Sequence, residues 1–263
     1  MAKINEYINE IICGDNVEVL REFPDECIDL TVTSPPYDNL RTYNGFDWDF
    51  EALAKELYRV TKRGGVVVWV VNDATINGSE TGTSFRQALY FKEIGFRLHD
   101  TMIYAKNNPI PLTHRRYEQA FEYMFVLSKE RPKTFNGLTR VNKYRGVPES
   151  GTFRHNGDEL TRRNTLGKTR ASSLRRNIWY YSVGKNSSAS DTLAHRHPAI
   201  FPEKLAEDHI LSWSNPGDII LDPFVGSGTT AKMAALNGRK YIGIDISEEY
   251  CELARKRVAE AIK

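Results

Sequence analysis

Hydrophobic and polar positions along the chain follow two alternating periods. Short apolar runs rich in β-branched residues predict strands, whereas apolar positions that recur every three or four residues predict helices. Strands are expected at residues 28–33, 66–71, 97–105, 120–127, 218–221 and 241–244. Helices are expected at residues 49–62, 84–94, 202–213, 227–236 and 247–261, several of them followed closely by glycine.

Strands that alternate with helices predict an α/β fold. The run Val66–Val71 is apolar at every position, which is typical of a strand covered on both faces in a parallel sheet. After residue 218 the order is strand, loop, helix, strand, helix, a parallel unit that is right-handed by default. We therefore expect a Rossmann-like, mostly parallel sheet flanked by helices.

The regular pattern stops between residues 129 and 176. The wider segment 129–196 contains 15 Lys and Arg but 5 Asp and Glu, whereas the whole chain has a formal net charge of only +2. Aromatic residues, including the run Trp179–Tyr181, lie among these cations, a combination that suits nucleic-acid phosphates and bases. A solvated basic loop is the alternative, and the Trp179–Tyr181 run either packs under the catalytic domain or contacts DNA. We expect residues 1–128 and 197–263 to be two halves of one domain, and 129–196 a target-recognition insertion.

Membrane-spanning and secreted proteins are not expected. No stretch approaches the roughly 20 apolar residues that cross a bilayer, and the first residues lack the charged-then-apolar pattern of a leader. The three cysteines (Cys13, Cys27 and Cys251) are far apart, and no histidines share a metal-ligand spacing. We expect reduced thiols, no bound metal and a cytoplasmic, nucleoid-associated location.

A glycine-rich loop follows the strand expected at 218–221. It runs from Asp222 through Gly226 and Gly228 to Thr230, and Asp245 closes the next strand nineteen residues after Gly226. Glycine lets the backbone approach a ligand closely, and an acid at that position can accept hydrogen bonds from ribose hydroxyls. The spacing also satisfies the nicotinamide-dinucleotide fingerprint, so an oxidoreductase remains an alternative. Asp222 favours a ligand with an ammonium or sulfonium group, since a carboxylate repels a pyrophosphate.

A rigid tetrapeptide, Ser34-Pro35-Pro36-Tyr37, follows the strand expected at 28–33. Two prolines fix the backbone, so the Ser34 hydroxyl and the Pro35 carbonyl are held as acceptors. The exocyclic amino nitrogen of a base is a poor nucleophile because its lone pair is delocalised into the ring. Two fixed acceptors draw that nitrogen toward a tetrahedral, reactive shape. Tyr37 offers a flat face for a base that has left the stack.

Together the two motifs resemble those of the DNA methyltransferases that modify adenine N6 or cytosine N4. The tetrapeptide of that family is Asp/Asn/Ser-Pro-Pro-Tyr/Phe, and its place before the cofactor loop resembles the permuted β subgroup. The resemblance covers most of the chain and implies S-adenosylmethionine as cofactor and double-stranded DNA as substrate. It implies catalytic roles for Ser34, Pro35, Pro36 and Tyr37. It implies cofactor contacts for Asp15, Asp222, Pro223, Phe224, Gly226, Ser227, Gly228, Thr229, Thr230 and Asp245.

The resemblance also suggests that the stretch from His197 to Leu205 lines the cofactor site. Serine at position 34 leans toward cytosine N4, because Thr-Ser-Pro-Pro-Tyr is common in that branch, and adenine N6 is the alternative. Expected DNA contacts are Arg115, Arg116, Arg162, Arg163, Arg175 and Arg176. Residues 106–109 border the base pocket, contact a phosphate or form an exposed loop, and Asp73 either faces the site or caps a loop.

The basic segment also allows a third function. A catalytically idle DNA-binding protein is a third possibility, because the basic segment alone would account for binding. Because enzymes of the resembled subgroup often pair, the resemblance implies a possible homodimer, and it places the chain in the context of restriction–modification.

Overall fold

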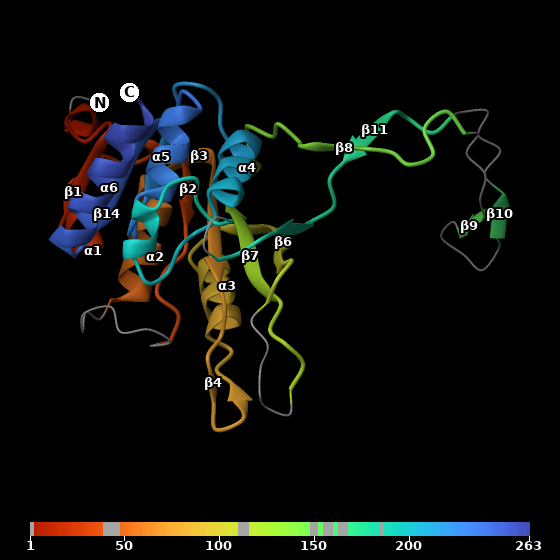
Figure 1. Cartoon of the computed structure of the whole chain (residues 1–263), viewed down its shortest axis with the longest axis horizontal. Helices are drawn as coiled ribbons and strands as arrows, with labels where there is room; N and C mark the ends of the chain where they lie inside the picture. The colour runs from red at the N-terminus through yellow and green to blue at the C-terminus, as the bar shows by residue number, and fades with distance from the viewer. Residues whose placement is uncertain are drawn as a thin grey trace. The chain divides into compact units, whose positions relative to one another are not determined.

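The computed structural model describes residues 3–38, 48–109, 116–147, 152–154, 160–162, 168–184 and 187–263. The chain divides into a larger compact unit, residues 1–136 with 177–263, and a smaller one, residues 137–176 (Figure 1). The smaller unit lies within the expected insertion, but residues 129–136 and 177–196 belong to the larger unit. No helix in the described ranges is long and apolar enough to cross a membrane.

The larger unit is built on an eight-stranded sheet with the order β1-β14-β13-β2-β3-β7-β6-β12. Its strands are β1 (Glu10–Cys13), β2 (Ile28–Thr33), β3 (Thr61–Val71), β6 (Arg97–Lys106), β7 (Phe121–Ser128), β12 (Ile178–Tyr181), β13 (Ile219–Asp222) and β14 (Lys240–Asp245). Neighbouring strands are parallel except in the two pairs that β7 makes. The predicted mostly parallel sheet is confirmed.

Helices cover both faces of this sheet. They are α1 (Asn16–Arg21), α2 (Phe50–Val60), α3 (Thr83–Glu93), α4 (Glu203–Trp213), α5 (Thr229–Leu236) and α6 (Glu248–Ala261), with 3-10 turns at Lys3–Glu6 and Leu193–Arg196. Helices α1, α2 and α3 share one apolar cluster with Trp69 and Leu221, whereas α5 and α6 share another with Ile11. Ile12, the next residue of β1, packs against the first cluster, and adjacent strand residues point to opposite faces. The two clusters therefore lie on opposite sides of the sheet.

Among the described residues, three antiparallel strand pairs lie outside the main sheet. They are β4 (Thr75–Ile76) with β5 (Ser79–Glu80), β8 (Thr139–Val141) with β11 (Ser172–Leu174), and β9 (Thr152–Arg154) with β10 (Leu160–Arg162). The last two pairs belong to the smaller unit, so its fold consists of short two-stranded ribbons in the residues that are described.

Most predicted elements are found within a few residues of their expected bounds, although β3 begins at Thr61 rather than at residue 66, and the short strands β4, β5 and β8–β11 were not predicted. The helix expected at 49–62 ends at Val60, because Thr61 begins β3 and its hydroxyl donates to the carbonyl of Leu57 at 2.6 Å. The short elements β1 and α1 were not predicted. Neither was β12, where Trp179 and Tyr181 are buried, so that run packs into the sheet.

The topology brings the two predicted motifs to one edge of the sheet. Ser34 follows β2 and Asp222 ends β13, and these strands are adjacent and parallel, with Leu221 opposite Thr31. Ligands of open parallel sheets bind at the carboxyl ends of the strands. Because β7 runs the other way, its first residues also reach this edge, where Glu122 lies opposite Tyr104 of β6.

Candidate functional site

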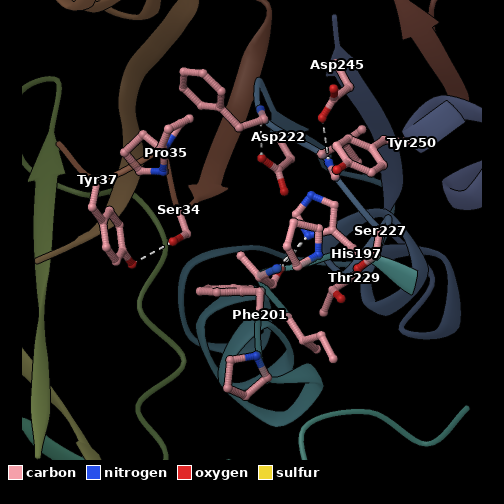
Figure 2. Close-up of a pocket in the computed structure, with 18 of the residues that line it drawn as sticks. Ser34, Pro35, Tyr37, His197, Phe201, Asp222, Ser227, Thr229, Asp245 and Tyr250 are labelled. Atoms are coloured by element: carbon pink, nitrogen blue, oxygen red, sulfur yellow. Dashed lines mark hydrogen bonds between the residues drawn. The ribbon is translucent and has the colours of Figure 1, made fainter. Parts of the chain in front are cut away.

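A cavity of about 800 Å³ lies at this edge of the sheet (Figure 2). Its wall contains the tetrapeptide Ser34–Tyr37, the glycine-rich loop from Asp222 to Ser227, and the segment from His197 to Pro202. Gly14–Asn16 after β1 and Asp245–Ser247 after β14 complete the wall around the loop. The two motifs therefore share one cleft, as the proposed chemistry requires, and its size is that of a small-molecule site.

A buried carboxylate, Asp222, and a half-buried one, Asp245 at the end of β14, give this part of the cavity its negative charge. Asp222 accepts hydrogen bonds from Thr33 Oγ1 at 2.7 Å and from the Phe224 N–H at 3.1 Å, yet burial raises the pKa of Asp222 to about 6. Asp245 accepts from the N–H groups of Gly226 and Ser247 at 2.9 and 3.0 Å, and burial raises the pKa of Asp245 as well. A cationic ligand would offset the cost of keeping both ionised.

The glycines of the loop have different roles. Gly226 has φ +47, and a Cβ there would lie 3.0 Å from His197 Nε2, so glycine admits the imidazole ring beside the cavity. Gly228 has φ +82, and a Cβ there would lie 2.8 Å from the Cα of Ala254 in α6. Gly228 and Thr230 do not contribute to the cavity wall, so their predicted contact with the cofactor gains no support.

The other predicted cofactor residues do line the cavity. They are Asp15, Asp222, Pro223, Phe224, Gly226, Ser227, Thr229 and Asp245. Asp15 also caps α1, accepting from the N–H groups of Val17 and Glu18 at 2.9 and 3.0 Å. The next side chain, Asn16, donates to the carbonyl of Pro223 at 3.2 Å and so ties this turn to the glycine-rich loop.

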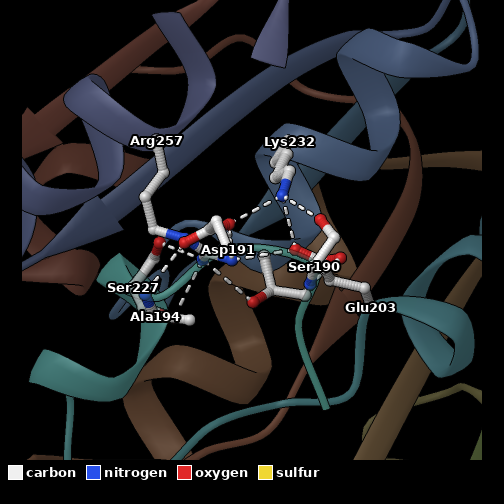
Figure 3. Close-up of polar contacts among 8 residues, drawn as sticks. Ser190, Asp191, Ala194, Glu203, Ser227, Lys232 and Arg257 are labelled. Carbon is white, nitrogen blue, oxygen red and sulfur yellow. Dashed lines mark hydrogen bonds and ion pairs between the residues drawn. The ribbon is translucent and has the colours of Figure 1, made fainter. Parts of the chain in front are cut away.

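An ion cluster with two buried cations, Lys232 and Arg257, holds the loop against the segment that carries His197 (Figure 3). Arg257 of α6 donates to the carbonyl of Ser227 and pairs with Asp191 and Glu203 at 3.0 and 2.9 Å. Lys232 of α5 pairs with the same two carboxylates at 2.7 and 2.6 Å. Since Asp191 and Glu203 flank the His197 segment in sequence, the cluster fixes that segment relative to the loop.

The tetrapeptide belongs to a chain of polar contacts. Ser34 Oγ lies 2.7 Å from Tyr37 Oη, which donates to Glu122 Oε2 at 2.9 Å, and Glu122 Oε1 pairs with Lys106 Nζ at 2.7 Å. A tyrosine has one hydroxyl proton, and this one points to Glu122, so Ser34 is the donor in its contact with Tyr37. The lone pairs of Ser34 Oγ can therefore accept an N–H from a base.

Several cavity residues were not predicted as site residues. Trp48 contacts the Phe224 ring with the centroids 4.9 Å apart, and Tyr250 contacts the His197 ring at 4.4 Å. Other unpredicted lining residues are Asn72, Tyr104, Gln119, Glu122 and Ser188. They come from separate elements and form no motif, and the one sequence signal was a carboxylate, Glu122, inside an apolar strand.

Two open alternatives are decided by the geometry. Lys106 and Asn108 line the cavity, so the 106–109 segment borders the site. Asp73 is buried outside the cavity wall and accepts from the N–H and hydroxyl of Ser84 at 2.9 and 2.6 Å. It therefore caps the first turn of α3.

The predicted DNA-contacting arginines are scattered. Arg116 donates to the carbonyl of Gly78 in the β4–β5 hairpin and lies outside the cavity wall. Arg175 and Arg176 are exposed in the smaller unit. Arg115 and Arg163 lie outside the described residues, and so does the side chain of Arg162.

The smaller unit has a basic hollow of its own, of about 470 Å³. It is lined by Arg140, Asn142, Lys143, Tyr144, Thr169, Arg170, Ser173 and Arg176. Four cations and one aromatic ring around a hollow suit an anionic ligand with a flat face.

The known proteins that this chain resembles belong to the enzyme class that the cavity residues predict. A family model described as DNA methylase, for N6 and N4 enzymes, matches residues 28–256. The chain is 60% identical over 238 residues to the orphan methyltransferase M.BamHII of Bacillus amyloliquefaciens, covering 89% of this chain and 90% of that protein. It is 29% identical over 259 residues to the DNA adenine methyltransferase YhdJ of Escherichia coli, covering 94% and 82%. The solved PvuII cytosine-N4-specific DNA methyltransferase shares the fold, with a TM-score of 0.69, 24% identity, and coverage of 96% and 90%.

The family model spans both the tetrapeptide and the glycine-rich loop. A nicotinamide-dependent oxidoreductase, which the glycine spacing alone had allowed, therefore has no support. Together the shared cavity, the family model and the M.BamHII match confirm the predicted class: the chain belongs to the N6/N4 family of DNA methyltransferases.

Proposed function

We propose that this DNA methyltransferase acts at a specific sequence in double-stranded DNA and methylates the N4 amino group of a flipped-out cytosine. The observation that carries the proposal is the shared cavity, in which Ser34 Oγ is held as an acceptor, with the buried carboxylate of Asp222 and the half-buried carboxylate of Asp245 in the same wall. Adenine N6 is the alternative acceptor of the methyl group.

The cofactor is S-adenosylmethionine, which supplies an electrophilic methyl group on a sulfonium. Its charges fit the cavity, because the desolvated carboxylates of Asp222 and Asp245 are stabilised by a cationic ligand. Asp222 would bind the cationic methionine end, and Asp245 would accept hydrogen bonds from the ribose hydroxyls. The rings of Trp48 and Phe224 provide apolar surface in the same wall.

The tetrapeptide would bind and activate the base. Ser34 Oγ and the Pro35 carbonyl accept the two amino hydrogens, which draws the nitrogen lone pair out of conjugation with the ring. The ring of Tyr37, whose hydroxyl donates to Glu122, would stack on the flipped base. As the nitrogen forms its bond to the methyl carbon, the carbon–sulfur bond breaks and the nitrogen must release one proton.

The choice of cytosine rests on Ser34. A neutral hydroxyl stands where many adenine enzymes of the resembled family carry a carboxylate or an amide, and Thr33-Ser34-Pro35-Pro36-Tyr37 is the form common in the cytosine branch. Lys106 and Asn108 bring N–H donors to this end of the cavity, which suits the ring acceptors of either base.

The smaller unit would supply DNA affinity. Its basic hollow offers Arg140, Lys143, Arg170 and Arg176 to phosphates, and phosphate contacts position a protein on a duplex while base contacts specify the sequence. A protein that modifies chromosomal DNA would work in the cytoplasm at the nucleoid.

Mass analysis of nucleosides tests this function directly. DNA incubated with the protein and S-adenosylmethionine should yield N4-methylcytosine, and Ser34→Ala or Tyr37→Ala should abolish it while cofactor binding survives. N6-methyladenine in place of N4-methylcytosine would overturn the choice of base and leave the enzyme class standing. Salt-sensitive DNA binding without any methylated nucleoside would point to a catalytically idle DNA-binding protein.

A further inference from the structure

The proton released in methyl transfer needs an acceptor, and the tetrapeptide offers none that is charged. The Pro35 carbonyl cannot keep a proton, and a serine hydroxyl can pass one on only if it gives up its own. The carboxylate nearest to Ser34 along its hydrogen bonds is Glu122, whose side chain is 15% exposed and lines the same cavity.

The contacts run in one direction from Ser34 to Glu122. A carboxylate offers only acceptors, so Tyr37 donates to Glu122 Oε2 at 2.9 Å, and Ser34 donates to Tyr37 Oη at 2.7 Å. Lys106 holds the other carboxylate oxygen, Oε1, at 2.7 Å, which leaves Oε2 to Tyr37. Each hydroxyl in the chain already points its proton toward Glu122.

We propose that Glu122 is a positioning residue for methyl transfer and the final acceptor of the amino proton. Through Tyr37 it turns the Ser34 hydroxyl so that Oγ accepts from the base. The inference rests on the proposed function, because it concerns the same amino group.

The proton transfer balances without another reactant. The amino group gives one proton to Ser34 Oγ, Ser34 gives its proton to Tyr37 Oη, and Tyr37 gives its proton to Glu122 Oε2. Both hydroxyls end neutral, the amino nitrogen ends neutral with one methyl group added, and Glu122 ends as a carboxylic acid beside Lys106.

The antiparallel direction of β7 is what makes this possible. Glu122 is the second residue of β7, and the start of a parallel strand would lie at the opposite edge of the sheet. Reversal of β7 brings the start of this strand to the edge where β2 delivers Ser34 and β6 delivers Lys106.

A double-mutant cycle on Glu122→Gln and Tyr37→Phe tests the proposal, with single-turnover methylation of duplex DNA as the readout. In Glu122→Gln, the amide oxygen would face Lys106 and the amide N–H would face Tyr37, which reverses the direction of the hydrogen bond between residues 122 and 37. In Tyr37→Phe, the aromatic ring is kept and this hydrogen bond is lost. Each single variant should lose roughly 10²-fold in rate, the size of a general-base contribution, with the cofactor Kd unchanged. Because both changes break one chain, the double variant should be no slower than the slower single variant.

A second tyrosine–glutamate pair provides the matched control. Tyr90 Oη donates to Glu51 Oε2 at 3.2 Å on an exposed surface, and neither residue lines the cavity. Tyr90→Phe and Glu51→Gln should methylate at the wild-type rate.

The outcomes separate the two levels of the argument. The role of Glu122 would be overturned if the two losses in methylation rate multiply in the double variant, or if each single variant methylates within twofold of the wild-type rate. The proposed function would still stand in either case, because the wild-type protein methylates DNA. If Glu122→Gln does not fold, Tyr37→Phe is sufficient as a test. A Tyr37→Phe enzyme that methylates at the wild-type rate would overturn the role of Glu122. A wild-type protein that methylates no DNA would overturn the proposed function and this inference together.

Discussion

Asp222 should make the cofactor-free protein less stable as the pH rises. The side chain is buried, and its pKa is raised from 3.8 to about 6 in the folded protein. The folded state therefore holds a proton that the unfolded state has already released between about pH 4 and pH 6, so the free energy of unfolding falls across that window. A shift of about two units corresponds to about 3 kcal/mol once both states are ionised.

Asp222→Asn removes this titration while the amide oxygen can still accept from Thr33. Thermal or urea melts at pH 5 and pH 8 measure the difference in unfolding free energy between variant and wild type. The variant should be more stable than wild type at pH 8. The difference in their unfolding free energies should grow by roughly 1.5 kcal/mol in favour of the variant between pH 5 and pH 8. An advantage that is independent of pH, or that shrinks toward pH 8, would contradict the assignment of the buried charge.

The same substitution should weaken cofactor binding. If Asp222 bonds a cationic group of S-adenosylmethionine, its loss costs roughly 1.5–3 kcal/mol, or about tenfold to hundredfold in Kd by calorimetry. A variant that is more stable without ligand and also binds S-adenosylmethionine as tightly as wild type would refute the role given to this carboxylate.

Three further substitutions test other parts of the structure. Gly228→Ala puts a Cβ 2.8 Å from the Cα of Ala254 at φ +82, so a melt followed by circular dichroism should show a loss of about 1–3 kcal/mol. Arg257→Met removes a fully buried cation from Asp191, which should cost about 3–5 kcal/mol and weaken cofactor binding measured by calorimetry. Arg176→Ala should weaken DNA binding for all sequences and lower the slope of log K against log salt by about 1, with cofactor affinity unchanged.

The part of the site that the sequence predicted is the part built from contiguous segments. A Pro-Pro turn and a glycine-rich loop each carry their backbone geometry in a few neighbouring residues, so Ser34 and Asp222 could be placed at strand ends without coordinates. Glu122 and Trp48 could not be predicted as site residues. Their place in the cavity depends on strand order and on the reversal of β7, which single-sequence periodicity does not reveal.

Short elements were missed for a related reason. Strand β1 has four residues with one fully buried, too few for a period to emerge. In β12 the alternation of buried and exposed residues is present, with Trp179 and Tyr181 buried and Tyr180 exposed, but flanking cations made the run resemble a DNA-binding surface. Gly228 was predicted to contact the cofactor, but the structure shows that glycine is needed there because α6 packs against it.

The charges at the two ends of the cavity suggest how the reaction is kept electrically balanced. The loop end holds Asp222 and Asp245, which favour a cation, and the base end holds the Lys106–Glu122 pair. If Asp222 and Asp245 hold the cationic end of S-adenosylmethionine, methyl transfer would remove one positive charge from the loop end, and in the proposed relay the released proton would neutralise Glu122 at the base end. The thioether product would then offset less of the cost of keeping Asp222 and Asp245 ionised, which favours release of the product. S-adenosylmethionine should therefore bind more tightly than S-adenosylhomocysteine at pH 8, and Asp222→Asn should narrow the ratio of their two Kd values. A ratio that is unchanged or wider in the variant would place the sulfonium away from Asp222.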